Sequence, residues 1–323
     1  MEKYTALTAM LGRVVDYAGT FPPARLSLED ALAVAARFRR TGRFPWLLKR
    51  VALTLDAARS LTPAGLYSAG ADGSAWELAV LGSEPESDPL VAIAGDLDAI
   101  AQLIGQFRSC SMELLVSSYE TRAVFDAVAA CDRREIGGLT AGLGELLKNR
   151  SEMAVSLEVP ARGDSFEGLQ ALLAAARSAP LRIGIKVRTG GDAAPDPGEL
   201  AAAISVVSQQ ACPFKATQGL HAPISANGSF GFVNLLAALN LAFSFRRCSV
   251  RSLQSCLSDS DASAFRFEKE RFRWRDLELP ASRIESARKA HQGCFGSCSI
   301  EEPDQLLHQF LSTTGIARKD ESV

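Results

Sequence analysis

Paired cysteines are missing from this sequence. The seven cysteines are an odd number, and only Cys294 and Cys298 stand close together, without the second pair that would complete a zinc site. Unpaired thiols of this kind are typical of a reducing compartment. We therefore expect a cytoplasmic protein.

An excess of charge of one sign is also missing, as are the apolar runs of a membrane protein. The formal net charge is -2, so no overall field attracts the chain to nucleic acid or to a membrane surface. The longest expected apolar helix, Phe232 to Phe245, is too short to cross a bilayer. The N-terminal stretch carries Glu2, Lys3, Arg13 and Asp16 and lacks the apolar core of a signal sequence. We expect neither nucleic acid nor a membrane as a partner.

The glycine signatures of nucleotide-binding proteins do not occur. Gly190 and Gly191 follow a predicted strand, but the remaining glycines of a dinucleotide or P-loop motif are absent. The serine motif of the α/β-hydrolase nucleophile is absent as well. The sequence therefore predicts no cofactor.

What the sequence does have is one pattern repeated along a single predicted domain, 1–323. Alternating apolar and polar stretches occur near residues 50, 77, 113, 154, 183 and 213, and a helical stretch follows each of them. Open doubly wound sheets have strands that are apolar throughout, whereas several of these strands have one face of small or polar residues. Such a face is expected where strands line a barrel interior. We predict a (β/α)8 TIM-like barrel whose last two units come from residues 246–323.

A stretch of alternating aromatic and charged residues, Phe265 to Trp274, is typical of an exposed β-hairpin. We predict a small hairpin insertion over residues 262–280. Basic residues between aromatics also occur in proteins that stack on nucleic acid bases. The acidic Glu268 and Glu270 in the same stretch favour instead a plain insertion, or an arm between the subunits of a homodimer.

Lysines on one face of two successive strands are the main chemical signal. The period of two puts Lys186 and Arg188 on one face of the first strand. In the second strand it puts Lys215 and Thr217 on one face. A helical stretch of suitable length lies between them, which makes the strands parallel neighbours. Lysines that face a barrel interior are costly unless they have partners or a chemical task.

Imine formation is the task that these lysines indicate. Two neighbouring ammonium groups repel each other, so one of Lys186 and Lys215 loses its proton more easily, and a neutral amine attacks a carbonyl to form a Schiff base. Glu158, on the preceding strand, is a candidate acid, base or neutralising charge. We favour Lys215 as the nucleophile because its strand leads into the loop that holds His221. The alternative is an internal network of salt bridges that fills the barrel.

Further site residues follow from their positions. His221 stands in a loop rich in Gly, Pro, Ser and Asn and is our candidate general acid or base. Glu158 and His221 are the only plausible metal ligands near the cations, and the nearby cations oppose a metal ion, so we predict a site without metal. We assign substrate binding to Arg188, Thr217 and Arg50.

The closing turn of the predicted barrel indicates an anion site. Gly296, Ser297 and Ser299 lie between a short strand and a helix with Glu302 in its first turn. Free backbone amides at a helix N-terminus attract anions, and the eighth βα loop of a barrel is a common phosphate or carboxylate site. A capping box between Ser299 and Glu302 is the alternative. Cys298 is a second candidate nucleophile, because a helix dipole lowers a thiol pKa.

Four motifs together resemble an uncharacterised family of bacterial proteins over nearly the whole chain. They are Asp16-Tyr17-Ala18-Gly19 with Phe21-Pro22-Pro23-Ala24, Lys186-x-Arg188-Thr189-Gly190-Gly191, Phe214-Lys215-Ala216-Thr217-x-Gly219-Leu220-His221 and Phe295-Gly296-Ser297-Cys298-Ser299. The resemblance implies that these segments act as one unit, and it implies no activity. The lysines on adjacent strands also show a local similarity to imine-forming barrel aldolases. How the Asp16-Tyr17 segment enters the site stays open.

Two functions are consistent with these residues. The first is a metal-independent lyase or aldolase-like enzyme that acts on a small anionic carbonyl compound. The second is a non-catalytic barrel that binds a small anionic metabolite and uses its cations for recognition alone. Chemical trapping of an imine separates the two, because only the first forms a covalent bond with its ligand.

Overall fold

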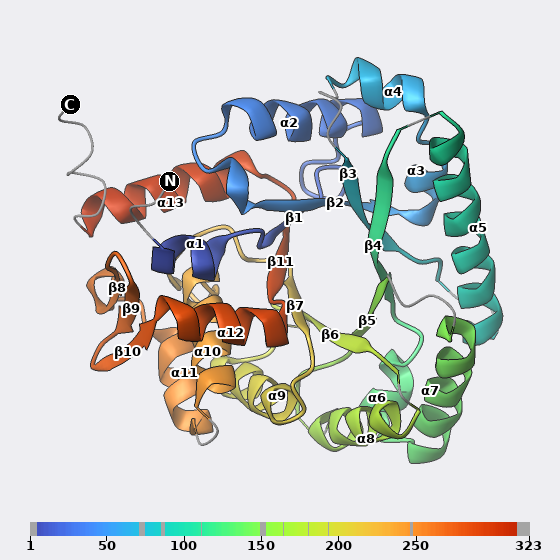
Figure 1. The fold of residues 1–323 in the computed structure, drawn as a ribbon. Helices are drawn as coiled ribbons and strands as arrows, with labels where there is room; N and C mark the ends of the chain where they lie inside the picture. Colours follow the sequence, from blue (N-terminus) through green and yellow to red (C-terminus); the bar gives the residue numbers. More distant parts are fainter. Residues whose placement is uncertain are drawn as a thin grey trace.

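The barrel predicted from the sequence is present. A computed structural model describes residues 5–70, 75–84, 88–110, 112–148, 153–163, 165–179, 181–192, 194–245 and 248–314. Eight parallel strands close in the order β1-β11-β7-β6-β5-β4-β3-β2, as Figure 1 shows. The barrel strands are β1 (Val15–Tyr17), β2 (Leu48–Thr54), β3 (Trp76–Leu81), β4 (Leu114–Thr121), β5 (Ala154–Glu158), β6 (Ile183–Arg188), β7 (Phe214–Thr217) and β11 (Cys294–Ser297).

Helices surround this barrel and connect its strands (Figure 1). They are α1 (Thr5–Leu11), α2 (Leu28–Thr41), α3 (Leu55–Arg59), α4 (Pro63–Ser68), α5 (Pro89–Ser109), α6 (Phe125–Ala129), α7 (Arg133–Leu147), α8 (Ser165–Ser178), α9 (Pro197–Gln209), α10 (Phe232–Ser244), α11 (Val250–Ser258), α12 (Ala281–His291) and α13 (Glu301–Thr313), with short 3-10 turns η1 (Pro45–Leu47) and η2 (Ala262–Ala264). Outward strand residues and inward helix residues together form one apolar core.

The first barrel strand comes from a segment that the sequence pattern left outside the barrel. β1 lies between β11 and β2, and its Asp16 is in register with Gly296 and Arg50. In the described part of residues 246–323, β11 is the only barrel strand, so the expectation of two βα units there is wrong. A strand of three residues is too short for its alternation to be recognised in a sequence, which explains the error.

The predicted hairpin insertion is also present. Its strands β8 (Phe265–Phe267) and β9 (Arg271–Trp274) are antiparallel, and a third strand, β10 (Leu277–Pro280), pairs with the other edge of β9. The aromatic residues of this sheet are buried, whereas Glu268, Arg271, Arg273 and Glu278 pair with one another on its exposed face. The sheet lies outside the barrel wall beside α1 and α12 (Figure 1). The ends of the predicted 1–323 domain lie outside the described residues.

The covering helix α5 changes one expectation. With 21 residues, it is long and apolar enough by length and composition to cross a membrane, so Phe232–Phe245 is not the longest apolar helix. Its buried side chains, Ile93, Leu97, Ile100, Leu103 and Phe107, face the core. Asp96 of the same helix is buried and accepts hydrogen bonds from Tyr119 on β4 and from Ser83 after β3. The fold therefore uses this helix as part of the helical layer around the barrel.

The barrel interior is polar rather than apolar. Strand alternation sends Val51, Leu53 and Leu78 outward to the helices and leaves the opposite faces to line the lumen. Several of the inward positions are small, among them Ala52, Ala79, Ser118, Ser156, Gly184 and Gly296. Small neighbours leave room for long charged side chains, and these fill the remaining space.

Candidate active site

A row of eight side chains of alternating charge crosses the barrel interior. In order of contact it joins Arg50, Asp16, Lys215, Glu120, Lys186 and Glu158, and it ends in Arg188 and Arg122, which both contact Glu158. We call these eight residues the charged chain. They come from β1, β2, β4, β5, β6 and β7, with Arg122 directly after β4. Closure of the barrel is therefore what brings them together.

Asp16 joins Arg50, at the inner end of the charged chain, to Lys215. Its two oxygens accept hydrogen bonds from Arg50 Nε at 2.8 Å and Arg50 Nη2 at 2.9 Å, a bidentate pair that is almost fully buried. Asp16 Oδ2 also accepts a hydrogen bond from Lys215 Nζ. Planar guanidinium and carboxylate groups match each other in this arrangement, which fixes both orientations. Asp16 thus enters the site from β1, which answers how its segment reaches the interior.

Glu120 and Glu158 continue the charged chain toward the carboxyl ends of the strands. Lys215 Nζ also donates a hydrogen bond to Glu120 Oε1. Lys186 Nζ lies 3.0 Å from Glu120 Oε2 and 3.0 Å from Glu158 Oε2. Each lysine is therefore placed between two carboxylates, and Glu120 stands between the two lysines.

These contacts set the ionisation of the buried groups. Burial by itself raises the pKa of Asp16, but the charges of Arg50 and Lys215 outweigh it and hold that pKa well below its usual range. Burial likewise raises the pKa of Glu120, yet the charges of Lys215 and Lys186 lower it to about 2. Burial lowers the pKa of Lys215, and the charges of Asp16 and Glu120 more than reverse this, so its pKa is raised. The expected repulsion between two lysines is therefore not what governs Lys215, because carboxylates lie between them.

The two lysines are held differently. Lys215 donates hydrogen bonds to Asp16 and Glu120. Lys186 contacts its carboxylates at ion-pair distance, and the buried Glu120 Oε2 accepts no hydrogen bond. Lys186 is therefore the amine with the looser alignment, although both side chains are more than nine-tenths buried.

The inner end of the charged chain continues toward the amino ends of the strands through Ser117. Arg50 Nη1 donates to Ser117 Oγ at 3.3 Å, and Ser117 Oγ donates to Glu77 Oε1 at 2.7 Å. Glu77 in turn pairs with the exposed Arg13. Each of the three nitrogens of Arg50 thus has a protein partner. This arrangement makes Arg50 a support for Asp16, and its predicted role in substrate binding gains nothing from the geometry.

The outer end of the charged chain is the barrel mouth. Glu158 Oε1 accepts a hydrogen bond from Arg188 Nε at 2.8 Å and lies 3.3 Å from Arg122 Nη1. The side chains of Arg188 and Arg122 are 37% and 34% exposed, whereas Glu158 is 2% exposed. The guanidinium of Arg122 also lies over the Phe125 ring, 4.4 Å from its centre. Two arginines at this end therefore reach solvent while they share one buried carboxylate.

Thr217 and Gly296 lie at the same level as Arg188. β6, β7 and β11 pair Arg188 with Thr217 and Thr217 with Gly296. A side chain at Gly296 would begin 3.3 Å from Thr217 Cγ2, so glycine keeps this part of the lumen open. Both residues are thus placed beside the mouth, and their role in substrate binding stays a prediction.

The predicted anion site after β11 is occupied by protein contacts. Ser297 is buried and its Oγ donates to the Ser299 carbonyl, while Ser299 Oγ accepts from the Glu302 amide at 3.1 Å. The first turn of α13 carries the acidic Glu301, Glu302 and Asp304, which oppose a bound anion. These contacts support helix capping at this turn rather than a ligand. Burial raises the pKa of the Cys298 thiol, in contrast to the lowering expected from a helix dipole.

His221 lies apart from the charged chain. Its Nδ1 is 2.8 Å from Glu302 Oε2 on α13, and both side chains are at least one-third exposed. Within the described residues, this is the partner that the structure gives to His221. The following loop is held by Asn234, which accepts from the Ser225 amide and donates to the Asp259 carbonyl. His221 therefore stands near the mouth on a fixed loop, and its predicted acid or base role has no contact in its favour.

Sequence patterns missed three members of the charged chain or left their place open. Glu120 and Arg122 were missed because the stretch recognised near residue 113 was not followed that far, whereas β4 continues to Thr121. Extending the alternation by two steps puts Ser118, Glu120 and Arg122 on one face, and this signal was available. Asp16 carried no such signal, because β1 is only three residues long.

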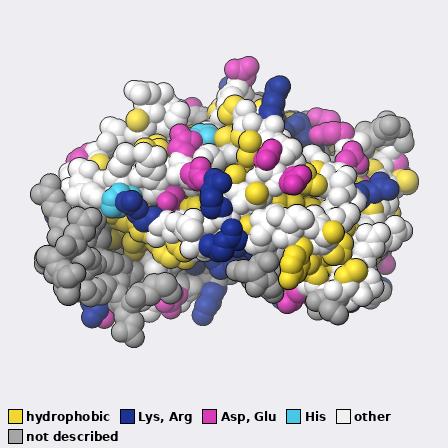
Figure 2. All heavy atoms as spheres, turned by 90° about the horizontal axis from the view of Figure 1, so that it is seen from above, with side chains coloured by type: hydrophobic (Ala, Val, Ile, Leu, Met, Phe, Trp, Pro, Cys, Tyr) yellow, Lys and Arg dark blue, Asp and Glu magenta, His cyan; other side chains and the backbone are white. Residues whose placement is uncertain are grey.

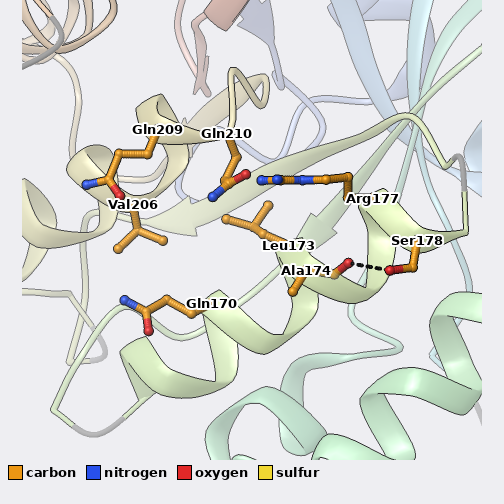
Figure 3. Close-up of a pocket in the computed structure, with 8 residues that line it drawn as sticks. All are labelled: Gln170, Leu173, Ala174, Arg177, Ser178, Val206, Gln209 and Gln210. Atoms are coloured by element: carbon orange, nitrogen blue, oxygen red, sulfur yellow. Dashed lines mark hydrogen bonds between the residues drawn. The ribbon is translucent and has the colours of Figure 1, made fainter.

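Other surfaces offer less chemistry than the interior. Figure 3 shows a hollow between α8 and α9, lined by side chains such as Gln170, Arg177 and Gln209, and none of the charged chain reaches it. Figure 2 shows the face over α2 and α4, where basic side chains stand among acidic and apolar ones. Mixed signs of charge give that face no field of one sign.

The described residues form no recognisable metal centre, and the comparisons with known proteins identify no relative of this chain. No group of three or more His, Cys, Asp or Glu side chains in that part of the chain is arranged to hold a metal ion. The carboxylates of the charged chain are instead paired with cations. Comparison with protein-family models, with curated proteins and with solved structures finds no match to this chain.

Proposed function

We propose that this barrel is a metal-independent lyase or aldolase-like enzyme that forms an imine between a lysine and a small anionic carbonyl compound. The observation that carries the proposal is the position of Lys186 between Glu120 and Glu158, inside a closed barrel. An amine in this position has proton acceptors already in contact with it, as imine formation requires. The seven free thiols support a reducing, cytoplasmic setting for this chemistry.

We assign the nucleophile to Lys186, and not to Lys215, which the sequence pattern favoured. Lys215 donates hydrogen bonds to two carboxylates and has a raised pKa, so it keeps its proton. Lys186 lies 3.0 Å from both Glu120 and Glu158, and because the two lysine charges hold the pKa of Glu120 low, Glu158 is the acceptor for the proton of Lys186. In this assignment Lys215 is the fixed positive charge that orients Glu120.

The proposed steps balance without an added reactant. Lys186 gives one proton to Glu158, whose Oε2 lies 3.0 Å from its Nζ, and the neutral amine forms a C–N bond with the carbonyl carbon. The carbonyl oxygen takes up that proton and a second one from the nitrogen and leaves as water, so an ammonium group and a carbonyl become a protonated imine and water. Glu158 then accepts the proton of a hydroxyl group on the carbon β to the imine carbon, the bond between the α and β carbons breaks, and the β carbon leaves as an aldehyde or ketone. The electron pair of the broken bond neutralises the iminium as an enamine, which takes a proton and is hydrolysed.

Borohydride trapping tests this proposal. The protein is incubated with small oxo acids, reduced with borohydride and weighed intact, and peptide mapping locates any adduct. We expect a single adduct on Lys186, its loss in Lys186→Met, and full trapping in Lys49→Met, a control lysine on the outward face of β2. Lys215→Met removes a positive neighbour of Lys186, so the pH of half-maximal trapping should rise. An adduct mapped to Lys215, or to surface lysines only, would refute the assignment.

A second function has its own observation in its favour. Every lysine of the charged chain is ion-paired, and the pKa of Lys215 is raised, so the resting site holds charged amines as a recognition site would. In that case the barrel binds a small anionic metabolite without covalent chemistry. Stabilisation of the parent protein by oxo acids in a thermal shift assay, together with no adduct under any condition, would establish this alternative.

A further inference from the structure

We infer that Arg122 and Arg188 form the binding site for a carboxylate that is bonded directly to the reacting carbonyl carbon, so that the substrate is a 2-oxo acid. The inference rests on the proposed function and names the substrate class of the same site. The site carries an excess of positive charge. The charged chain holds five basic residues, Arg50, Lys215, Lys186, Arg188 and Arg122, and three acidic ones, Asp16, Glu120 and Glu158.

The uncompensated positive charge lies at the mouth. Asp16 and Glu120 offset the cations of the inner part, whereas Arg188 and Arg122 share Glu158 with Lys186. Both arginines are about one-third exposed, while the inner members are nearly fully buried. Arg188 uses Nε on Glu158 and Arg122 uses Nη1, which leaves further N–H groups of two guanidiniums for a ligand. A guanidinium fork of this kind suits a planar carboxylate.

The distance between this carboxylate-binding site and the amine of Lys186 determines the substrate class. One carboxylate, Glu158, contacts Lys186 with Oε2 and both arginines with Oε1. The amine and the guanidiniums are therefore separated by no more than the width of one carboxylate and two contacts. An anionic group that reaches the arginines from a carbon bound to Lys186 must be close to that carbon in the chain of bonds. A carboxylate next to the carbonyl meets this condition, whereas a phosphate on a longer arm would have to fold back.

Arg122 is held in place independently of the ligand. Its guanidinium lies over Phe125, at the beginning of α6, and this cation–π contact fixes a long side chain that would otherwise be mobile at the surface. A fixed cation loses less conformational entropy on binding. We therefore expect Arg122 to contribute to affinity together with Arg188.

The test compares the trapping of matched carbonyl probes. Pyruvate carries the carboxylate, hydroxyacetone is its neutral counterpart of similar size, and dihydroxyacetone phosphate carries a distal phosphate. We measure the concentration for half-maximal borohydride trapping in the parent, in Arg188→Gln and in Arg122→Gln. Each substitution should raise the value for pyruvate about tenfold or more, the usual effect of losing a charged hydrogen bond, and change that for hydroxyacetone less than about threefold. Comparing the ratio of the two probes across proteins removes their different intrinsic reactivity.

Arg13→Gln is the matched control, because Arg13 pairs with Glu77 at the opposite end of the interior and should change neither probe. Trapping of hydroxyacetone with no response of pyruvate to either arginine variant overturns this inference alone and leaves the proposed function standing. If trapping of pyruvate and of hydroxyacetone weakens to the same extent in the arginine variants, the arginines act through Glu158 on Lys186. If dihydroxyacetone phosphate is trapped at a lower concentration than pyruvate, the arginines bind a phosphate. Either result also overturns the inference that the substrate is a 2-oxo acid. No adduct with any probe on the parent refutes the proposed function and this inference with it. If Arg188→Gln does not fold, Arg122→Gln decides by the same criteria.

Discussion

Replacing Glu120 with glutamine tests the charged chain where it is most buried. Glu120 Oε1 accepts from Lys215, and its Oε2 contacts Lys186 at 3.0 Å. Glutamine has nearly the same shape, so Glu120→Gln removes one negative charge without leaving a cavity. Two buried ammonium groups then lose the anion between them, and breaking a buried ion pair in this way costs about 3–5 kcal/mol of unfolding free energy.

A second route to the magnitude uses the pKa of Glu120. The charges of the two lysines overcome burial and lower that pKa from 4.5 to about 2. Each unit of pKa difference between the folded and unfolded states is worth about 1.4 kcal/mol, which gives roughly 3 kcal/mol at neutral pH. Both values depend on the contacts of Glu120 with Lys215 and Lys186.

The sign of the pH dependence follows from the direction of this shift. A carboxylate with a lowered pKa in the folded state stabilises the fold above its unfolded pKa, and this contribution is lost as the pH falls from about 4.5 toward 2. The difference in unfolding free energy between the parent and Glu120→Gln should therefore be constant near pH 7. By pH 4 it should have narrowed by about 1 kcal/mol.

Urea denaturation at pH 7 and pH 4, followed by circular dichroism, measures both quantities. Glu278→Gln is the matched control, because Glu278 also bridges two cations, Arg271 and Arg273, but on the exposed face of the β8–β10 sheet. Exposed pairs contribute little, so the control should lose less than about 1 kcal/mol. Equal losses in the two variants, or a loss below about 1 kcal/mol for Glu120→Gln, would show that the charged chain does not hold the barrel as described.

Two further predictions concern packing. Gly168→Ala should destabilise the fold by about 1–3 kcal/mol, because a Cβ at this position in α8 would lie 2.0 Å from the Val128 carbonyl oxygen. The control Gly138→Ala in α7 has open space around it and should stabilise the fold by about 0.5–1 kcal/mol. Thermal unfolding of both variants measures the two effects, and equal midpoints would contradict the prediction. Asn234→Ala should cost about 2–4 kcal/mol in urea denaturation, because it leaves the buried Asp259 carbonyl and two other backbone groups without a partner, and an unchanged midpoint would contradict this.

The alternation of polar residues was enough to place much of the interior. A period of two is a local property of a strand, so the inward position of Lys186, Arg188 and Lys215 follows from the residues next to them in the chain. The repeated strand and helix pattern likewise predicted a barrel, because parallel neighbours need helical crossovers. Where the local signal was weak, as in the three-residue β1 that carries Asp16, prediction failed.

The pairing of charges across the lumen was decided by the tertiary structure alone. Lys215 contacts Glu120, which is 95 residues away in the sequence, and Asp16, which is 199 residues away. No local pattern encodes contacts at such separations. From the sequence, two lysines on adjacent strands implied mutual repulsion and a lowered pKa. Closure of the barrel instead brings Asp16 and Glu120 from other strands against Lys215, and their charges reverse the direction of the pKa shift. The sign of an electrostatic effect depends on every charge within reach, and only the folded chain determines which charges those are.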